Sequence, residues 1–578
     1  MRRALLLSLC LCFAQAAAAA PHVTVLVDGI GGVMLKNVMA YLSIATYQDA
    51  PDLSDSLVGQ LDARAPDQIR QALQPFGYYD AQVLSKLTPE GDGWVARYSI
   101  TLPPPVRIRH VDVVLTGEGR NDAVYDGFFQ TLSYHSGDQL NQKAYEDSKR
   151  GLQELAAQRG YIDARFTKTE LAVNPQEHWA DITLRFNTGK RYYFGDVSFV
   201  QDFLDPEFLA RYVKFKPGDP YDNDALLKMQ YALNDAGYFN SVNVEALRQE
   251  AKDDKCIPIR VTLTPSLRNK YTLGAGYGTD TGPRVTLGWT NRRLNSEGHT
   301  LGVQAQFSHI MESFLVNYTV PLSDPATEKL VYSYGNSRQV LGSVIDYVNI
   351  LGVARFSTAG VWSLNQYLQL EHDRSDVQGS PPLNSTLLLP GVTVSRVDSD
   401  DLILPTRGYR ISADLRGANN ALFSDTSFAQ MHLIAKLLVP LGDTTHLLLR
   451  GEAAGTAVKS PSELPVSQRF FAGGDQSVRG FSYNSLGPRD ADGNNVGGKD
   501  LLVGSIEIDQ MFGPIFGMAG FIDAGDATDS FSTSLEKGVG AGLRWRTPIG
   551  MVRLDLAHPV KRPDLDRVRV HISIGPDL

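Results

Sequence analysis

The sequence predicts a fold in two parts: three α+β repeats, each ordered strand–helix–helix–strand–strand, followed by an all-β, sixteen-stranded antiparallel transmembrane barrel. The repeats are indicated by a glycine followed by an aromatic residue, at Gly77, Gly160 and Gly237, about 80 residues apart. The barrel is indicated by the second half, where helical patterns vanish from about residue 270 and apolar and polar residues alternate.

Length and composition limit the class of protein. The 578 residues are too many for one core and correspond to about four structural units. Hydrophobic residues make up 43% and charged residues 21%, as in a folded chain. The net charge of −9 argues against a nucleic-acid partner. The 52 glycines, 24 tyrosines and 24 phenylalanines favour thin, aromatic-rich β structure over a helical bundle.

Residues 1–20 are expected to be a secretory signal peptide. Arg2 and Arg3 form a short basic region, residues 4–13 are apolar and residues 16–20 are all alanine. Two of the three cysteines fall in this segment, so the mature chain would keep Cys256 alone and form no internal disulfide. We expect Cys256 to be a small buried strand residue.

The three repeats are expected at residues 21–104, 105–189 and 190–268. Each opens with an alternating strand, and each has a helix that ends at its glycine–aromatic motif. Glycine suits that place because helices often end in a left-handed residue, and the aromatic residue then begins the next strand. The opening strands are predicted near 23–27, 106–115 and 192–200, and the helices from Pro66, over 140–159 and over 224–236.

Residues 269–578 are expected to form the barrel. No stretch after the signal approaches 18 consecutive apolar residues, and only helices and closed barrels satisfy the backbone inside lipid. In the last predicted strand Val568, Val570 and Ile572 alternate with polar residues, so one face is apolar and the other would line a wet lumen. The sixteen strands are predicted near residues 271–279, 283–290, 299–309, 312–321, 328–337, 347–357, 361–372, 385–396, 409–417, 427–440, 445–455, 501–511, 517–524, 537–546, 550–557 and 567–575.

The connections between these strands alternate in length. If the repeats are periplasmic, the short turns near 442–444 and 547–550 face the periplasm. Trp289, Trp362 and Trp545 then lie at periplasmic strand ends, as an aromatic girdle requires. The longer segments, which would face outward, are 373–384, 455–500 and 527–537.

The longest of these loops has the features of a functional site. A loop of this length is usually a surface lid or disordered, but its glycine pairs and the run Val478-Arg479-Gly480-Phe481 suggest a tight turn that enters the lumen. Glu507 and Asp523 lie on polar faces of later strands, where one arginine can donate to both carboxylates. Alternatively, these charged residues only line the lumen, where each is solvated by water and none pairs with another.

These motifs resemble those of the superfamily of outer-membrane assembly and two-partner secretion barrels. Val478 to Phe481 match its Val-Arg-Gly-Phe/Tyr motif, and Phe521 to Gly525, with Asp523 between them, match its aromatic-x-Asp-x-Gly motif. Residues 401–408 resemble its Asp-x-x-x-Pro-x-x-Gly turn. The three repeats resemble its periplasmic POTRA domains, so the resemblance covers the whole mature chain.

The number of repeats is similar to that of the TamA family, the barrel subunits of the translocation and assembly module. This resemblance implies the cell outer membrane of a Gram-negative bacterium, with the N-terminal domains in the periplasm. It implies a role in the insertion, assembly or translocation of outer-membrane proteins and autotransporters. The implied partners are a TamB-like periplasmic protein anchored in the inner membrane, client β-barrel proteins or autotransporters, and outer-membrane lipid.

Other functions fit the sequence less well. A passive porin would explain a polar lumen but not the repeats. A two-partner secretion transporter for one dedicated exported protein shares the arginine motif, but it normally has two domains and an N-terminal plug helix. The sequence has no Gly-x-Ser-x-Gly elbow, His-Glu-x-x-His helix or phosphate-binding loop, so we expect no enzyme, no metal and no cofactor.

The barrel must close by joining its first strand to its last. On both sides of that seam the sequence predicts weak pairing between the strands. Three glycines leave the first strand little side-chain packing, and the Gly-Pro at the end of the last strand removes a ladder donor and permits a bend. This predicts a lateral gate whose exposed first strand templates a client strand, with Gly276 near Ser573. Alternatively, the glycines only relieve barrel curvature. The seam residues are Gly274, Gly276, Gly278, Ser573, Gly575 and Pro576.

Overall fold

The computed structural model describes residues 22–575 except 49, 51–52, 92, 252, 281, 378–380, 402, 531–534, 549 and 561–567. The predicted signal peptide at 1–20 and Pro576 of the predicted seam lie outside the described residues. The chain forms two compact units: one holds the first two repeats and part of the third, and the other holds the rest of the third repeat and the barrel. In the described part of the chain no helix is long and apolar enough to cross a membrane.

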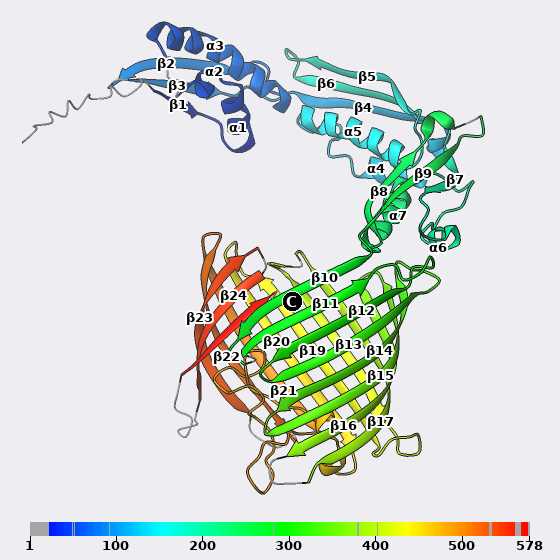
Figure 1. Ribbon diagram of the computed structural model, residues 1–578. Coiled ribbons are helices and arrows are strands. Elements are labelled where there is room, and N and C mark those ends of the chain that lie inside the picture. The colour runs from blue at the N-terminus through cyan, green and yellow to red at the C-terminus, as the bar shows by residue number, and fades with distance from the viewer. Residues whose placement is uncertain are drawn as a thin grey trace, which may run out of the picture. The chain divides into compact units, whose positions relative to one another are not determined.

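Each repeat contains a three-stranded sheet whose last strand lies in the middle, in the orders β1-β3-β2, β4-β6-β5 and β7-β9-β8 (Figure 1). In the first two repeats the opening strand is parallel to the central one and the other is antiparallel to it. The predicted α+β repeat is therefore confirmed. The elements are β1 (Val23–Asp28), α1 (Gly32–Tyr41), α2 (Ser43–Thr46), α3 (Asp55–Leu73), β2 (Gln82–Glu90) and β3 (Gly93–Thr101); β4 (Arg107–Thr116), α4 (Ala123–Gln130), α5 (Gln142–Gln158), β5 (Arg165–Asn174) and β6 (Trp179–Asn187); and β7 (Tyr193–Val200), α6 (Pro206–Ala210), α7 (Asn223–Asp235), β8 (Phe239–Ala246) and β9 (Cys256–Pro265).

The start of the first predicted helix was wrong. Pro66 lies inside α3, which begins at Asp55, and the side chain of Ser54 caps the helix by accepting a hydrogen bond from the Leu57 N–H. An interior proline removes one helical hydrogen bond. The helix tolerates this because its apolar face, including Leu61 and Ile69, is buried in the core of the repeat.

The glycine–aromatic motif has one structural role that recurs along the chain. Gly77, Gly160 and Gly237 have φ angles of +84°, +84° and +77°, the left-handed conformation that ends each helical stretch. The carbonyl of Gly77 accepts a hydrogen bond from the Val106 N–H at 2.8 Å, and that of Gly160 accepts one from the Tyr192 N–H at 2.8 Å. The same glycine thus ends one repeat's helix and receives the start of the next repeat.

The second half is a single sixteen-stranded antiparallel sheet in which the strands follow one another in chain order from β10 to β25 (Figure 1). The sixteen-stranded barrel predicted from alternation is confirmed for the described residues. Its strands are β10 (Asn269–Gly278), β11 (Gly282–Asn291), β12 (Thr300–Ser308), β13 (Met311–Pro321), β14 (Glu328–Leu341), β15 (Val344–Ala359), β16 (Trp362–Val377), β17 (Leu383–Ser399), β18 (Gly408–Ala418), β19 (Phe428–Pro440), β20 (Thr445–Val458), β21 (Asp500–Phe512), β22 (Phe516–Thr528), β23 (Glu536–Thr547), β24 (Gly550–Pro559) and β25 (Arg569–Gly575).

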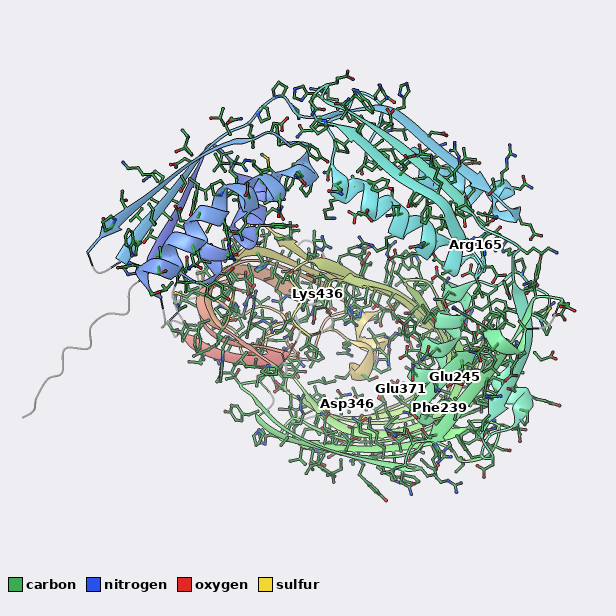
Figure 2. All side chains as sticks on the ribbon, turned by 90° about the horizontal axis from the view of Figure 1, so that it is seen from above. Arg165, Phe239, Glu245, Asp346, Glu371 and Lys436 are labelled. Atoms are coloured by element: carbon green, nitrogen blue, oxygen red, sulfur yellow. The ribbon has the colours of Figure 1, made fainter. Side chains whose placement is uncertain are left out.

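The two faces of the barrel wall differ as the alternation requires. Large side chains such as Tyr332 and Tyr334 are exposed. Asp346 and Glu371, labelled in Figure 2, are buried. Trp362 begins β16 and is 46% exposed, which suits the predicted aromatic girdle.

Two smaller expectations were wrong. Most of segment 373–384, expected to be a loop, is strand, because β16 runs to Val377 and β17 begins at Leu383. Polar residues can continue these strands because neighbours satisfy them: the Ser375 hydroxyl donates to the Asp346 carboxylate at 2.6 Å. The second expectation was that Cys256 is buried. It is the first residue of β9 and is only half-buried.

Candidate functional site

The loop between β20 and β21 packs against the inner wall of the barrel. Ala472 and Leu486 form a backbone bridge within the loop. Val478 and Phe481 are almost fully buried, in one apolar cluster with Val503 of β21. This cluster anchors the loop and fixes the turn between them, which carries Arg479.

Close packing of the loop requires glycine on both sides of the contact. Gly480 has a φ of +97°, and a Cβ there would lie 3.1 Å from the backbone of His558. On the wall, a Cβ at Gly538 of β23 would overlap the carbonyl oxygen of Arg479. Gly525, predicted from the motif, lies on β22, where a Cβ would come 2.8 Å from the Leu502 carbonyl oxygen. A side chain at Gly480 or Gly538 would push loop and wall apart, and one at Gly525 would push β22 away from its neighbour β21.

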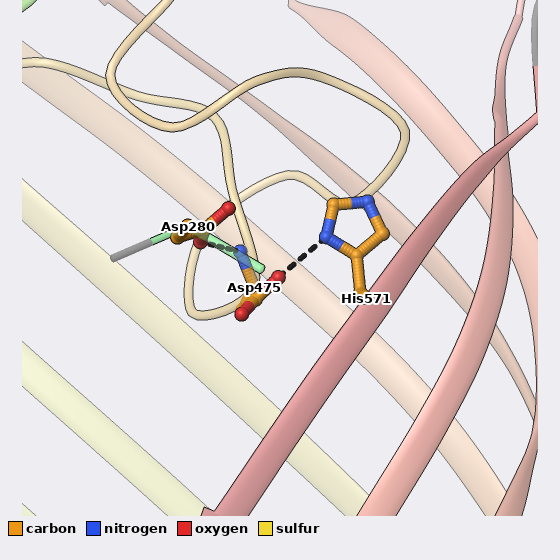
Figure 3. Close-up of side chains that lie close together, drawn as sticks. All are labelled: Asp280, Asp475 and His571. Carbon is orange, nitrogen blue, oxygen red and sulfur yellow. Dashed lines mark hydrogen bonds and ion pairs between the residues drawn. The ribbon is translucent and has the colours of Figure 1, made fainter. Parts of the chain in front are cut away.

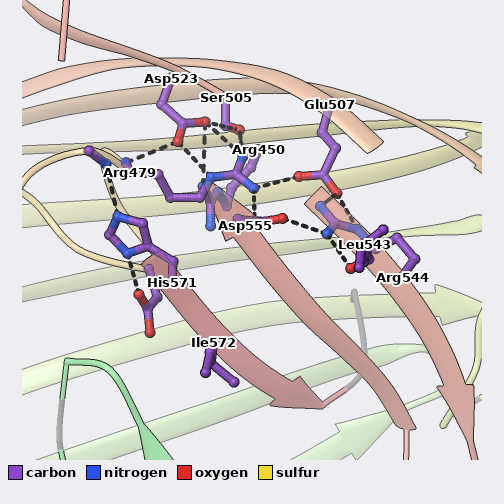
Figure 4. Close-up of polar contacts among 12 residues, drawn as sticks. Arg450, Arg479, Ser505, Glu507, Asp523, Leu543, Arg544, Asp555, His571 and Ile572 are labelled. Carbon is purple, nitrogen blue, oxygen red and sulfur yellow. Dashed lines mark hydrogen bonds and ion pairs between the residues drawn. The ribbon is translucent and has the colours of Figure 1, made fainter. Parts of the chain in front are cut away.

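The structure brings Arg479 together with both predicted carboxylates (Figure 4). Its Nε donates to one oxygen of Asp523 at 2.7 Å and its Nη2 to the other at 2.9 Å, which is a bidentate pair. Its Nη1 donates to Glu507 at 2.7 Å. The guanidinium carbon lies 3.3 Å from the ring centroid of Phe521. The side chain of Arg479 is only 4% exposed and that of Asp523 is fully buried.

Two charged residues that are hydrogen-bonded within the network, Asp555 and Arg544, were not predicted as partners. Asp555 on β24 accepts from the Nη1 of Arg479 at 2.9 Å. Arg544 on β23 pairs with both Asp555 and Glu507, so Glu507 lies between two arginines. The network therefore joins the loop to four consecutive strands, β21 to β24, through buried, charge-assisted hydrogen bonds.

A second polar cluster lies where the first and last strands approach each other (Figure 3). His571 of β25 contacts the carboxylate of Asp475 in the loop through its Nδ1 at 2.5 Å. The backbone N–H of Asp475 donates to Asp280, in the turn after β10, at 2.6 Å. Burial raises the pKa of the Asp280 carboxyl to about 6, and the neighbouring Asp475 carboxylate adds to the rise. We call Asp280, Asp475 and His571 the seam cluster.

The hydrogen bonds of the seam cluster fix the protonation of its imidazole. The Gly480 N–H donates to Nε2 of His571 at 2.9 Å, so the ring proton sits on Nδ1 and is donated to Asp475. The three side chains offer ligand atoms within 4.8 Å of one another, a spacing that could hold a metal ion. A metal ion at Nδ1 would require the ring to give up that proton and the bond to Asp475.

The seam between β10 and β25 differs from every other strand junction in the sheet. Among the described residues, β10 pairs with β11 and β25 with β24, and no ladder joins β10 to β25. In the described part of the chain, the junction is bridged by a hydrogen bond from the Ile572 N–H of β25 to the hydroxyl of Thr279, the residue that follows β10, at 3.1 Å. That hydroxyl also donates to Asp475 at 3.1 Å, so the loop bridges the seam.

The predicted seam residues lie along this junction. Gly274, Gly276 and Gly278 are on β10, and Ser573 and Gly575 are on β25. A Cβ at Gly274 or Gly276 would meet only ordinary contacts, at 3.6 and 3.7 Å. No close approach therefore demands glycine at those two positions.

The residues missed by sequence reasoning differ in the signal that could have found them. Arg544 alternates with Leu543 and Trp545, and Asp555 with Leu554 and Leu556, so both could be assigned to the lumen face but not to a partner. Asp280 and Asp475 lie in turns, where alternation gives no face at all.

Comparisons with known proteins agree with this architecture. A family model described as Omp85 superfamily domain matches residues 268–577. The first repeat matches a model described as POTRA domain TamA domain 1 over residues 24–102, and the third matches one described as surface antigen variable number repeat over residues 192–265.

The similar proteins are distant. Outer membrane protein assembly factor BamA of Nitratidesulfovibrio vulgaris is 24% identical over 517 residues, covering 84% of this chain and 63% of its own length. That of Neisseria meningitidis serogroup B is 22% identical over 596 residues, covering 89% of this chain and 72% of its own. The structure of BamA from Haemophilus ducreyi lacking POTRA domains 1–3 gives a TM-score of 0.67 at 17% identity, covering 81% of this chain and 99% of that one. The chain thus spans under two thirds of the length of the first relative.

Proposed function

The chain belongs to the Omp85 superfamily, and from that membership we propose that it assists the insertion, assembly or translocation of outer-membrane proteins and autotransporters. Its barrel lies in the outer membrane and its repeats lie in the periplasm. The role we propose is that of a scaffold, not of an enzyme: the barrel offers strand edges and a positioned loop to a client.

The observation that carries this proposal is the seam. A strand without a neighbour presents a row of unpaired N–H and C=O groups, which can pair with another extended chain. Strand β10 has a ladder on its β11 side, whereas among the described residues no ladder joins its other side to β25, and the hydrogen bond at this junction goes to Thr279 just after β10. Each hydrogen bond contributes only about 0.5–1.5 kcal/mol net, so opening this seam disrupts far less than opening any laddered junction.

The loop is suited to control that opening. The network around Arg479 fixes it to the wall, while the seam cluster and Thr279 connect it to both edges of the seam. We therefore assign a lateral gate to β10 and β25, with the loop as the element that holds it in register. A client strand pairing with β10 would replace the bond between Ile572 and Thr279.

Three features support a TamA-like member of the superfamily. The chain has three repeats, its first repeat matches a model described as a TamA domain, and that repeat has its own buried core. A TamA-like protein would work with a TamB-like periplasmic partner anchored in the inner membrane. The first repeat can receive a partner strand at the edge strands β1 and β2, and β2 carries Leu84, which is 75% exposed.

Deletion of residues 21–104 is expected to abolish capture of the partner while leaving the barrel folded, because the first repeat has its own core. Capture would be measured by co-purification from native envelopes, and folding by heat-modifiable migration on gels. The single substitution Leu84→Asp should weaken capture without removing the repeat. Undiminished capture by the deleted chain would refute the assignment of the first repeat.

The function itself can be tested with the full chain in lipid vesicles. An unfolded client β-barrel protein added outside should become heat-modifiable and protease-resistant about tenfold faster than in vesicles that hold a porin of similar size. Equal rates in the two vesicle preparations would refute the proposed function. Acceleration of one exported protein, with release into the vesicle and no effect on barrel clients, would instead identify a two-partner secretion transporter.

A further inference from the structure

The outer face of the barrel carries a groove that the assembly function does not use. A continuous row of register partners crosses five strands, from the periplasmic end of β16 to the middle of β20: Trp362 pairs with Arg396, Arg396 with Ile411, Ile411 with Ala435, and Ala435 with Gly451. Trp362 and Ile411 are 46% and 41% exposed, so this row faces the membrane. The row runs from β16 to β20.

The row changes from large side chains to very small ones, and this makes a hollow. Ala435 and Gly451 form its floor, while Leu437 and Leu449 of the neighbouring row form an apolar wall. Together with Trp362, Arg396, Tyr409, Ile411, Lys436 and Arg450 they line a groove of about 770 Å³. We call this the outer groove.

A cationic group stands at one end of the outer groove. The guanidinium of Arg396 lies 5.4 Å from the ring centroid of Trp362 and 5.2 Å from that of Tyr409. Its Nε is buried and donates to no acceptor among the residues that the structure describes. Asp398 is 3.8 Å from another guanidinium nitrogen, too far for a hydrogen bond, and its own side chain is 55% exposed. An arginine at a membrane surface with an unsatisfied N–H requires an acceptor.

A second arginine of the same barrel has its guanidinium paired within the protein. Arg355 lies in register with Leu330 near the periplasmic end of β15. Its Nη2 donates to both carboxylate oxygens of Glu328, at 3.2 Å each. For Arg396 the nearby Asp398 carboxylate is beyond hydrogen-bonding distance, and the outer groove lies beside the guanidinium.

We propose that the outer groove binds one phospholipid, with the phosphodiester accepting hydrogen bonds from Arg396 and an acyl chain lying over Ala435 and Gly451. Charge complementarity selects the anionic phosphate, which a guanidinium contacts through two parallel N–H donors. The aromatic residues fix the depth, because tryptophan and tyrosine lie at the headgroup level. The apolar walls fix the orientation, because only a ligand with a long hydrocarbon tail fills the groove.

Native mass spectrometry of the full chain released from micelles tests this site. With added dioleoylphosphatidylglycerol, the wild-type chain should retain one lipid, and dioleoylglycerol, which lacks the phosphate, should not be retained. Arg396→Gln should lower retention roughly tenfold, since it removes a charge-assisted contact. Ala435→Phe should have the same effect by filling the groove, and Arg396→Lys should restore part of the retention. Heat-modifiable migration confirms that each variant is folded.

Arg355→Gln is the matched control, and it should leave lipid retention unchanged. Equal loss in Arg355→Gln and Arg396→Gln, or equal retention of dioleoylglycerol and the phospholipid, would overturn the proposal. Retention by Arg396→Gln at the wild-type level would also overturn it. A photoreactive group at Leu437 should label lipid in native membranes, and labelling of a polypeptide instead would identify the groove as a protein-docking surface.

Discussion

Replacing Arg479 by alanine is expected to destabilise the barrel by about 3–5 kcal/mol, because it removes the hydrogen-bonded cation of the buried Asp523 carboxylate and one of the two cations shared by Glu507 and Asp555. Asp523 is fully buried and would lose its bidentate partner, while Glu507 and Asp555 would keep Arg544 alone. The measurement is the free energy of unfolding from urea titrations of the barrel in micelles. Client assembly should fall as well, since the loop would no longer be fixed to the wall.

The pairing of Arg479 with Asp523 makes a sharper prediction than the single substitution. In a double-mutant cycle, Arg479→Ala and Asp523→Ala together should lower the free energy of unfolding by less than the sum of their separate effects, because both remove the same buried contact. A double mutant whose loss equals the sum of the two single losses would show that the pair contributes nothing. Arg410→Ala, which removes an exposed arginine of β18, serves as the control and should change stability by less than about 0.5 kcal/mol.

The contrast between predicted and missed residues of this network has a physical origin. Alternation assigns a strand residue to the lumen face, and the motif pointed to Arg479, Asp523 and Glu507. Which lumen residues meet depends on the stagger between strands and on the barrel's curvature. Arg544 and Asp555 are register neighbours of Arg553 and Gly542, so strand pairing alone does not bring them together. Their contact runs diagonally across the ladder, through long side chains.

More of the fold than of the site could be predicted from the sequence, for a related reason. Alternating residues recur in every strand, so a local misjudgement such as the early end of β16 leaves the strand count unchanged. The start of α3 was misjudged because Pro66 is a strong local signal for a helix start, whereas the burial that sustains the helix is tertiary. The seam cluster depends on two turns and one strand that are distant in sequence, and no local pattern connects them.

A disulfide across the seam is expected to stop client assembly. Sequence reasoning expected Gly276 near Ser573, and the observed bond joins Thr279 to Ile572, one residue from Gly278 and Ser573. Cysteines at Gly276 and Gly278 would therefore each be tested against Ser573 in a chain carrying Cys256→Ser. The pair that cross-links most completely in membranes should reduce the assembly rate roughly tenfold, because the edge of β10 is then held against β25 and cannot receive a client strand.

Comparison with a cross-link elsewhere in the wall separates gating from general rigidity. Ser337 and Val348 lie directly opposite each other on β14 and β15, within a continuous ladder. A disulfide between cysteines at these positions should leave assembly at the rate of the reduced protein, because that junction never needs to open. Reduction should restore assembly only in the seam variant. If the oxidised seam variant assembles clients at full rate, the barrel works without parting β10 from β25, and the loop contacts at Thr279 and His571 hold a closed wall instead of a gate.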